Sequence, residues 1–394
     1  MKYRKNKSGD DLSILGFGCM RLPTRAGIID FNAAKATLMY AYENGVNYFD
    51  TAYIYHAGQS EGFVGRALAE VRDKVNIATK LPPYLVKRPA DIEKIFNTQM
   101  KRLGTEYIDY YLMHAVKDLS TWEKLIEHGI IDWIADKKAK GIIKNIGFSF
   151  HGVYDEFIKL LDAYEWDFVQ IQYNYLDEYN QAGVAGLDYA SKKGLPVIIM
   201  EPLLGGRLAG AHPEAAQKVL DEFPNEWSNA EWALRWLWND PRVTVVLSGM
   251  GDMAQVEENV RIAGEAMPGG LSEDELTAIE DVKLELKRRN KVPCTGCRYC
   301  MPCPNNVDIP GCFKDYNNLD IEPNKVMAKL KHIGFKSGLT GGADTGAHMC
   351  IKCGKCKPQC PQNIDIPEQL DNVAREMEGI LYKMISGIKK LGKK

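Results

Sequence analysis

The stretch VNYFDTAYIY, residues 46–55, is an apolar run that ends in Asp50 and, five residues later, in Tyr55. By itself it is a modest signal, because an aspartate that follows a strand is often a turn or cap residue. The next two strand-like runs, VNIATK and IDYYLMH, end in Lys80 and His114. Side chains of these types together can polarise and protonate a carbonyl group. The recurrence at three successive strand ends therefore predicts a chemical site rather than three unrelated turns.

Strand-like and helical segments alternate along the first two thirds of the chain. Short, nearly continuous apolar runs are typical of parallel strands that helices cover on both faces. Eight such runs favour a closed (β/α)8 barrel over an open doubly wound sheet, and they place the active site at the C-terminal ends of the strands. The expected strands lie near residues 14–22, 46–52, 75–80, 108–114, 143–149, 168–174, 196–201 and 243–249.

Composition and charge restrict the class of protein. The chain has 394 residues, with 50 lysines and arginines against 52 aspartates and glutamates, and this near balance gives no indication of nucleic acid as a partner. No apolar run approaches the roughly 20 residues that span a bilayer, and the N-terminus lacks the apolar core of a signal peptide. We therefore expect a cytoplasmic protein without a membrane partner.

Cysteine is concentrated in the C-terminal part, where nine of the ten cysteines lie beyond residue 293. Eight of these nine form the motifs Cys-x2-Cys-x2-Cys-x2-Cys-Pro, ending at Pro304, and Cys-x2-Cys-x2-Cys-x3-Cys-Pro, ending at Pro361. Three cysteines three residues apart, followed by Cys-Pro, are typical of iron–sulfur ligands, whereas zinc ribbons use two separated Cys-x2-Cys pairs. Spacing therefore favours iron–sulfur clusters over zinc, although the two-residue gap before Cys303 departs from the ferredoxin pattern. The predicted ligands are Cys294, Cys297, Cys300, Cys303, Cys350, Cys353, Cys356 and Cys360.

These features divide the chain into three parts. We expect the barrel at residues 1–270, a connecting helix at 271–290, and a small, mainly helical iron–sulfur domain with a C-terminal helix at 291–394. Ser272 and Glu275 form a capping-box pattern at the start of the connecting helix.

The residues at the strand ends resemble those of the aldo-keto reductases. The family pattern Asp-Thr-Ala-x-x-Tyr is met by Asp50 and Tyr55, with Lys80 and His114 after the next two strands, and the resemblance covers about residues 10–265. It implies a nicotinamide-dependent interconversion of a carbonyl and an alcohol with these four as catalytic residues. A free tyrosine, with a pKa of about 10, is a reluctant acid at neutral pH, and a nearby ammonium makes its proton easier to give. Tyr55 would thus be the proton donor, Lys80 would supply the charge, Asp50 would hold Lys80, and His114 would orient the carbonyl oxygen.

The same resemblance implies NADP or NAD as the cofactor. Ser149 and Gln172 would hold the carboxamide of the nicotinamide, residues 201–208 would form the loop that binds the pyrophosphate, and the segment after strand eight would bind the adenosine. Gly249 and Gln255 stand where NADP-preferring relatives often have lysine and arginine, so the choice between NADH and NADPH stays open. The predicted cofactor contacts are Ser149, Gln172, Leu203, Gly205, Gly206, Ser248, Gly249, Gln255, Glu258 and Asn259.

The C-terminal part resembles ferredoxin-type proteins that hold two [4Fe-4S] clusters. In such proteins the cysteine before proline reaches the cluster of the other motif. By this resemblance Cys360 joins the first three cysteines of the first motif, and Cys303 joins those of the second. Cys19 and Cys312 are left over, and we expect them to be small packing residues.

As a whole the chain resembles the aldo-keto reductases that carry a C-terminal 4Fe-4S ferredoxin-type domain. We expect an oxidoreductase that acts on a small carbonyl or alcohol substrate. Two alternatives stay open. In one, the clusters exchange electrons with ferredoxin or another redox protein. Direct coupling of the two halves is not simple, because hydride transfer moves two electrons while a cluster passes one, and no flavin site is evident in the sequence. In the other, the barrel holds nucleotide without turnover as a redox sensor.

Overall fold

The structure is a computed structural model, which describes residues 1–289, 291–319, 325–337, 344–379 and 382. The chain divides into two compact units. The first comprises Met1–Leu203 and Trp227–Leu276, and the second comprises Leu204–Glu226 and Thr277–Lys394. The domain boundaries expected from the sequence stay a prediction. Leu204–Glu226, which lies between two barrel strands in the chain, belongs to the same compact unit as the C-terminal part.

The first unit contains a closed barrel of eight parallel strands in the order β10-β11-β12-β3-β6-β7-β8-β9. Each coincides with an expected run, so the predicted (β/α)8 barrel is confirmed. The barrel strands are β3 (Leu15–Gly18), β6 (Tyr48–Asp50), β7 (Asn76–Leu81), β8 (Ile108–Val116), β9 (Ile143–Phe150), β10 (Phe168–Gln172), β11 (Val197–Met200) and β12 (Val243–Ser248). Two short antiparallel hairpins accompany it, β1 (Tyr3–Lys5) with β2 (Asp11–Ser13) and β4 (Thr24–Arg25) with β5 (Ile28–Ile29).

The barrel interior changes from apolar to polar along the strands. Side chains two residues apart on a strand share a face, so Tyr48 and Asp50 point the same way, as do Ala78 and Lys80. Tyr48, Ala78 and Phe168 belong to one buried cluster with residues of the other strands. One step further along, the same strands present buried polar groups. An apolar floor thus supports polar side chains near the C-terminal strand ends.

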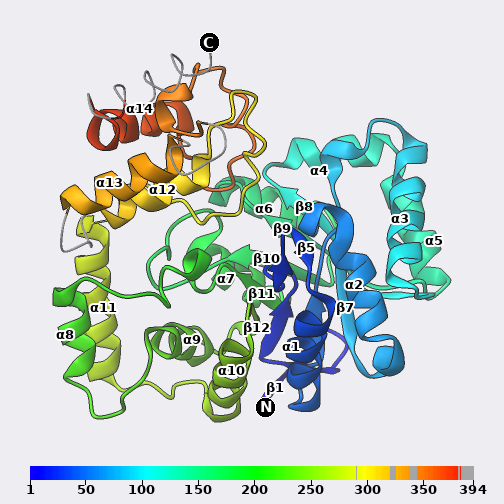
Figure 1. The fold of residues 1–394 in the computed structure, drawn as a ribbon. Coiled ribbons are helices and arrows are strands. Elements are labelled where there is room, and N and C mark those ends of the chain that lie inside the picture. The colour runs from blue at the N-terminus through cyan, green and yellow to red at the C-terminus, as the bar shows by residue number, and fades with distance from the viewer. Residues whose placement is uncertain (290, 320–324, 338–343, 380–381, 383–394) are drawn as a thin grey trace. The chain divides into compact units, whose positions relative to one another are not determined.

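Helices surround the strands of the first unit (Figure 1). Several begin at side-chain caps, as where Asp30 accepts a hydrogen bond from the backbone N–H of Ala33 at 3.2 Å. The helices of this unit are α1 (Phe31–Glu43), α2 (Gln59–Ala67), α3 (Pro89–Leu103), α4 (Leu119–Glu127), α5 (Ile130–Ala139), α6 (Tyr154–Asp162), α7 (Gly183–Lys192), α9 (Asn229–Asn239) and α10 (Met253–Glu265), with the 3-10 turns η1 (Tyr55–Gly58), η2 (Ala69–Lys74) and η3 (Pro83–Leu85).

The second unit is mainly helical, as the sequence predicted. The capping box that starts α11 is present: the backbone N–H of Ser272 donates to the Glu275 carboxylate at 2.8 Å, and that of Glu275 donates to the Ser272 hydroxyl at 3.2 Å. The last helix in the described part ends at Met377, and residues 380, 381 and 383–394, on which part of the expected C-terminal helix falls, lie outside the described residues. The elements are η4 (Leu204–Gly206), α8 (Glu214–Asp221), α11 (Glu273–Arg289, beginning in the first unit), α12 (Ile309–Asn318), α13 (Lys325–Lys336), η5 (Ala347–Met349) and α14 (Ile366–Met377).

Within the described ranges, no helix combines the length and the apolar character needed to cross a membrane.

Candidate active site and cysteine sites

The four predicted catalytic residues lie together at the C-terminal ends of β6, β7 and β8. The Lys80 ammonium donates to Asp50 Oδ1 at 2.6 Å and to the backbone oxygen of Thr51 at 2.8 Å. The Tyr55 hydroxyl lies 3.5 Å from Lys80 Nζ. The ring of His114 meets that of Tyr55 edge-on, with centroids 5.9 Å apart. Residues that the sequence placed on separate strands therefore form one constellation.

Lys80 is a buried cation held by a buried anion. Its side chain is 1% exposed and that of Asp50 is 4% exposed. Burial lowers the pKa of Lys80 from its usual value, and the neighbouring Asp50 carboxylate opposes that shift. The Lys80 ammonium lies 3.5 Å from the Tyr55 hydroxyl, and in general an ammonium beside a phenol favours the phenolate form.

His114 is held as a neutral imidazole. Burial lowers its pKa well below 6.5, and the positive charge of Lys80 lowers it further. A neutral ring keeps one N–H donor for an oxygen atom and adds no positive charge next to Lys80.

An irregularity in β8 accompanies His114. Met113 pairs with Phe148 of β9 and Val116 pairs with Phe150, so β8 uses three steps where β9 uses two. Ala115 takes up the extra residue with a φ of 53°. Such bulges re-aim side chains next to active sites. The apolar run in the sequence gave no signal of this extra residue.

Two buried polar side chains that the sequence analysis missed support the constellation. Gln170 on β10 donates from Nε2 to the second carboxylate oxygen of Asp50 at 3.1 Å. Glu61 is fully buried and pairs at 3.0 Å with Arg102, which also donates to the backbone oxygen of Tyr53. The latter contacts fix the loop that carries Tyr55. The two-residue spacing between Gln170 and Gln172 was a usable signal, because it puts both on the interior face.

The residues expected to hold the nicotinamide carboxamide are buried near the ends of β9 and β10. Ser149 Oγ accepts a hydrogen bond from the backbone N–H of Ala115 at 2.8 Å, which leaves its own hydrogen to donate. Gln172 donates from Nε2 to Asp177 at 2.9 Å and accepts from Gln181 at 3.1 Å. A hydroxyl donor at Ser149 and an amide at Gln172 are chemical types that can bind a carboxamide.

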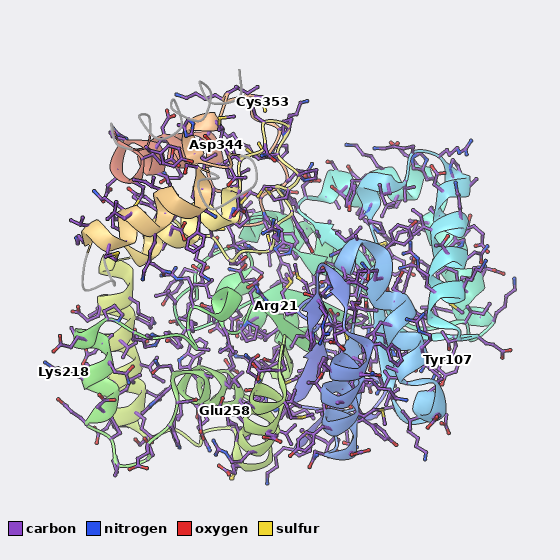
Figure 2. The ribbon with its side chains drawn as sticks, in the orientation of Figure 1. Arg21, Tyr107, Lys218, Glu258, Asp344 and Cys353 are labelled. Atoms are coloured by element: carbon purple, nitrogen blue, oxygen red, sulfur yellow. The ribbon has the colours of Figure 1, made fainter. Side chains whose placement is uncertain are left out.

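The segment after β12 has a defined structure. The buried Ser248 hydroxyl accepts a hydrogen bond from Asn259 Nδ2 at 2.9 Å. Gln255 is exposed, and its side chain caps the start of α10 through Gly251 N at 2.9 Å and Asp252 at 2.8 Å. Glu258, labelled in Figure 2, is partly exposed on the same helix.

Arg21 adds a cation to this region that the sequence analysis did not select. A Cβ atom at Gly249 would lie 3.0 Å from Arg21 Cδ, so the glycine provides the space that the arginine stem occupies. Arg21 follows β3, and its position is labelled in Figure 2. Because residues 21 and 249 are far apart in the chain, this contact could not be predicted from the sequence.

The other expected cofactor residues lie after β11. Leu203 is partly buried against the core of the first unit. Gly205 and Gly206, in the second unit, have φ values of 68° and 94°, which a side chain at either position would strain. A Cβ atom at Gly205 would also lie 2.1 Å from the backbone oxygen of Thr295, whereas one at Gly206 would meet no atom within 4 Å. The glycine loop therefore packs closely against the first cysteine motif.

The cysteines form two groups in the second unit. One pocket is lined by Cys294, Cys297, Cys300 and Cys360 among other residues. Burial raises the pKa of the Cys300 thiol to about 12, and the thiols of the other three cysteines raise it as well. None of the ten cysteines, all of which lie in the described part of the chain, is in a disulfide. Four soft donors that converge without a disulfide fit an iron–sulfur cluster.

The second group contains Cys350, Cys353 and Cys356 with Cys303. Burial raises the pKa of the Cys350 and Cys356 thiols, and Cys303 and Cys353 are among the neighbours that raise both. The structure thus brings Cys303 to the second motif despite its shorter spacing.

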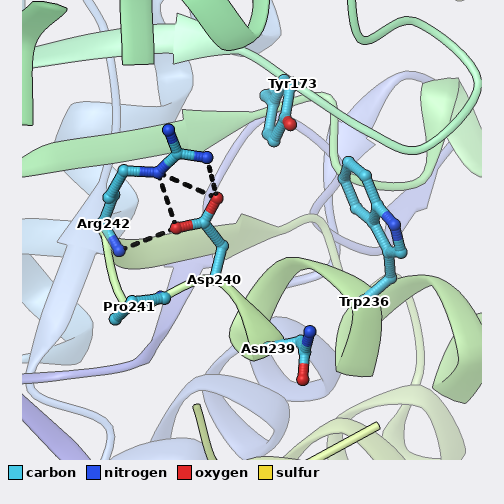
Figure 3. A pocket seen from close by; sticks show the side chains of 6 residues that line it. All are labelled: Tyr173, Trp236, Asn239, Asp240, Pro241 and Arg242. Carbon is cyan, nitrogen blue, oxygen red and sulfur yellow. Dashed lines mark hydrogen bonds and ion pairs between the residues drawn. The ribbon is translucent and has the colours of Figure 1, made fainter. Parts of the chain in front are cut away.

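A separate cavity in the first unit, of about 350 Å³, contains none of the four catalytic candidates. Figure 3 shows its aromatic side, Tyr173 and Trp236, with ring centroids 5.1 Å apart. On the other side the Arg242 guanidinium pairs with Asp240 at 2.6 Å. That charge pairing satisfies the arginine within the protein, and we assign the cavity no role in catalysis.

Comparison with known proteins identifies the family. The model of the aldo/keto reductase family matches residues 14–283. The chain belongs to that family. A second family model, the 4Fe-4S dicluster domain, matches residues 293–365. The chain is therefore an oxidoreductase of the aldo-keto reductase type with a 4Fe-4S dicluster domain.

Relatives of this aldo-keto reductase match its barrel. An uncharacterised oxidoreductase of Bacillus subtilis, YqkF, is 28% identical over 71% of this chain and 96% of its own length. An NADH-specific methylglyoxal reductase of Escherichia coli is 25% identical over 70% of this chain and 96% of its own length. The solved holo form of an aldo-keto reductase from Bacillus halodurans has a TM-score of 0.60 and 28% identity, covering 72% of this chain and 96% of that one.

Proposed function

We propose that the barrel catalyses the NAD(P)H-dependent interconversion of a small carbonyl compound and its alcohol, with Tyr55 as the proton donor. The observation that supports this most directly is the buried Lys80–Asp50 pair, at 2.6 Å, with the Tyr55 hydroxyl 3.5 Å from the ammonium. The chemistry that a bound nicotinamide supplies is hydride transfer to the carbonyl carbon. Negative charge then develops on the carbonyl oxygen, so a proton and positive potential are needed beside it.

Each side chain has one part in this proposal. Tyr55 gives its phenolic proton to the carbonyl oxygen and takes it back when an alcohol is oxidised. Lys80 stabilises the phenolate that remains, and Asp50 keeps the ammonium in place. The neutral ring of His114 donates a hydrogen bond that orients the carbonyl oxygen.

We propose the predicted cofactor residues as nucleotide contacts, with Ser149 and Gln172 on the carboxamide. The cofactor is NADH or NADPH. Gly249 and the exposed Gln255 provide no cation for a 2'-phosphate, whereas Arg21 lies directly beside Gly249. An NADH-specific relative of the same family supports keeping both nucleotides in the assay.

We propose that the second unit holds two [4Fe-4S] clusters, one on Cys294, Cys297, Cys300 and Cys360, and the other on Cys350, Cys353, Cys356 and Cys303. The donor set supports this, because the thiols converge in two groups of four and each group takes its Cys-Pro cysteine from the other motif. Such clusters, when present, supply one-electron transfer.

A second candidate function is electron exchange with ferredoxin or another redox protein. It is favoured by the surface position of the second thiol group. Cys353 is exposed, and the neighbouring Ile351 is 65% exposed. An exposed apolar side chain beside a redox centre suits contact with a protein partner.

Replacing Tyr55 by phenylalanine tests the catalytic proposal. The variant lacks the acid but keeps the ring, so carbonyl reduction should fall by about 10²- to 10⁴-fold while nucleotide binding stays the same. Binding can be followed by quenching of tryptophan fluorescence. The control is Tyr107→Phe, which removes a hydroxyl just before β8, at the opposite end of that strand from His114. A sensor without turnover predicts that neither substitution changes any reaction.

An anaerobic titration distinguishes the two candidate functions. The iron-loaded protein is mixed with NADH or NADPH, before and after addition of a mixture of aldehydes and ketones. Decay of the nicotinamide band only with carbonyl, at constant cluster absorbance, supports a conventional reductase. Bleaching of the cluster band without carbonyl would instead show electron flow between the two halves.

A further inference from the structure

Three side chains with metal-binding atoms meet in the helical core of the second unit. Cys312 lies on α12, His332 on α13, and Glu378 directly follows α14; their exposed fractions are 0%, 1% and 2%. One atom from each of the three lies within 4.8 Å of the other two. His332 Nε2 and Glu378 Oε1 are 3.0 Å apart. Neither predicted iron–sulfur ligand set includes any of them.

The imidazole and the carboxylate are each oriented by further hydrogen bonds. His332 Nδ1 lies 2.8 Å from the carboxylate of Asp315, on the side of the ring away from Glu378. Glu378 Oε1 accepts from the backbone N–H of Ala347 at 2.6 Å, and Oε2 accepts from that of His348 at 2.9 Å. Metal-binding histidines usually donate their other ring N–H to a carboxylate, and metal-binding carboxylates are themselves hydrogen-bonded. The surroundings of this cluster have both features.

The charges in the cluster also favour a cation. Glu378 is a buried carboxylate that contacts two imidazoles, His332 at 3.0 Å and His348 Nδ1 at 2.9 Å, and a second carboxylate, Asp315, contacts His332. Buried charge is costly unless it is paired. Protonation of His332 or His348 could supply the pairing, but it gives no reason for a thiol at this place. Among the described residues, the Cys312 thiol has a weak contact with the backbone oxygen of Thr345, at 3.7 Å.

We propose that Cys312, His332 and Glu378 bind one Zn²⁺ ion. A thiolate, an imidazole nitrogen and a carboxylate oxygen form a mixed donor set that suits this borderline-soft cation. Binding releases the thiol proton of Cys312 and leaves His332 Nε2 as the ligand atom, with the Nδ1 hydrogen donated to Asp315. The proposal replaces the expectation that Cys312 is only a packing residue, and it does not depend on the reaction of the barrel.

The ion would join three helices to the chain that enters the second cysteine motif. Glu378 holds η5, and η5 ends one residue before Cys350. Packing around this junction is close, since a Cβ atom at Gly346 would lie 2.9 Å from Glu378 Oε1. Asp344, labelled in Figure 2, accepts a hydrogen bond from Tyr382 at 2.9 Å on the same side. A zinc ion here would therefore fix the position from which the second thiol group starts.

X-ray absorption at the zinc edge tests the site, because it reads zinc without interference from iron. The full chain is purified anaerobically with its iron, incubated with equimolar ZnCl2 and passed through a desalting column. We expect about one zinc per chain, with one sulfur neighbour near 2.3 Å and nitrogen or oxygen neighbours at about 2.0–2.1 Å. A spectrum with sulfur neighbours alone would place the zinc on the cysteine motifs and overturn the proposal, as would the absence of bound zinc.

Substitution of Cys312 gives a second test. Cys312→Ala should lower the zinc content at least about tenfold, while iron, acid-labile sulfide and visible absorbance stay at the level of the unaltered protein. Cys19→Ala is the matched control, since it removes the other buried thiol outside the motifs and should leave zinc unchanged. Equal zinc in the Cys312→Ala variant and the unaltered protein would refute the assignment. If that variant does not fold, the absorption spectrum of the unaltered protein decides alone.

Discussion

Replacement of Lys80 by methionine would leave the Asp50 carboxylate buried without its cation. The two side chains are 2.6 Å apart and only 1% and 4% exposed, so the pair is shielded from solvent. Removing one partner of a buried ion pair costs about 3–5 kcal/mol. For a urea slope of about 3 kcal/mol per M, this corresponds to a fall of about 1–1.7 M in the unfolding midpoint of the barrel.

Tryptophan fluorescence is the appropriate assay, because all seven tryptophans lie in the first unit. The matched control is Lys140→Met. Lys140 pairs with Asp136 at 2.7 Å, nearly the same distance, but the two side chains are 60% and 47% exposed. An exposed pair is worth about 1 kcal/mol or less, so the midpoint should move by no more than about 0.3 M. If the two variants shift the midpoint equally, Lys80 is not the buried partner of Asp50 and the reasoning about Tyr55 fails.

Three further outcomes are expected. Burial lowers the pKa of His151 from 6.5 to about 4, so between these pH values the unfolded chain binds a proton that the folded barrel does not. The stability of the barrel should therefore fall as the pH drops from 6.5 toward 4, by up to about 1.4 kcal/mol per pH unit. His151→Gln should reduce this dependence on pH, as measured by urea titrations at several pH values. Gly205→Ala would place a Cβ atom 2.1 Å from the backbone oxygen of Thr295 and should speed iron release to a chelator several-fold. Gly206→Ala shares the strain of a positive φ but meets no atom within 4 Å, so its effect should be clearly smaller. Equal rates in the two variants would show that the contact with Thr295 does not matter. Gln255→Arg should tighten NADPH binding about tenfold relative to NADH in a fluorescence titration, and an unchanged ratio would contradict the alignment of this segment.

Periodic features of the fold could be predicted from the sequence. The eight apolar runs determine the barrel, and the parallel arrangement brings Asp50, Lys80 and His114 to the same end without knowledge of any side-chain contact. The Tyr55 loop follows directly from its strand, so its place was also accessible. The grouping of Cys303 with the second motif agrees with what the ferredoxin resemblance implies.

Contacts between distant segments could not be predicted. Nothing in the local pattern around Arg21 indicates that its stem fills the space above Gly249. The packing of Gly205 against Thr295 joins two segments of the second unit that are far apart in the chain. Cys312 was expected to be a small packing residue because no partner could be assigned to it, whereas the structure brings His332 of α13 and Glu378, just after α14, close to it.

The crossed grouping of the thiols also bears on how the chain is made on the ribosome. Cys360 follows Cys300 by 60 residues (360 minus 300) and completes the first group of four. At elongation rates of about 5–20 residues per second, three thiols of that group wait about 3–12 s for the fourth. During this interval the incomplete group is open to competing metal ions. On the proposed ligand sets, delivery of the first cluster follows translation through Cys360, and a nascent chain released before Cys356 carries neither group complete.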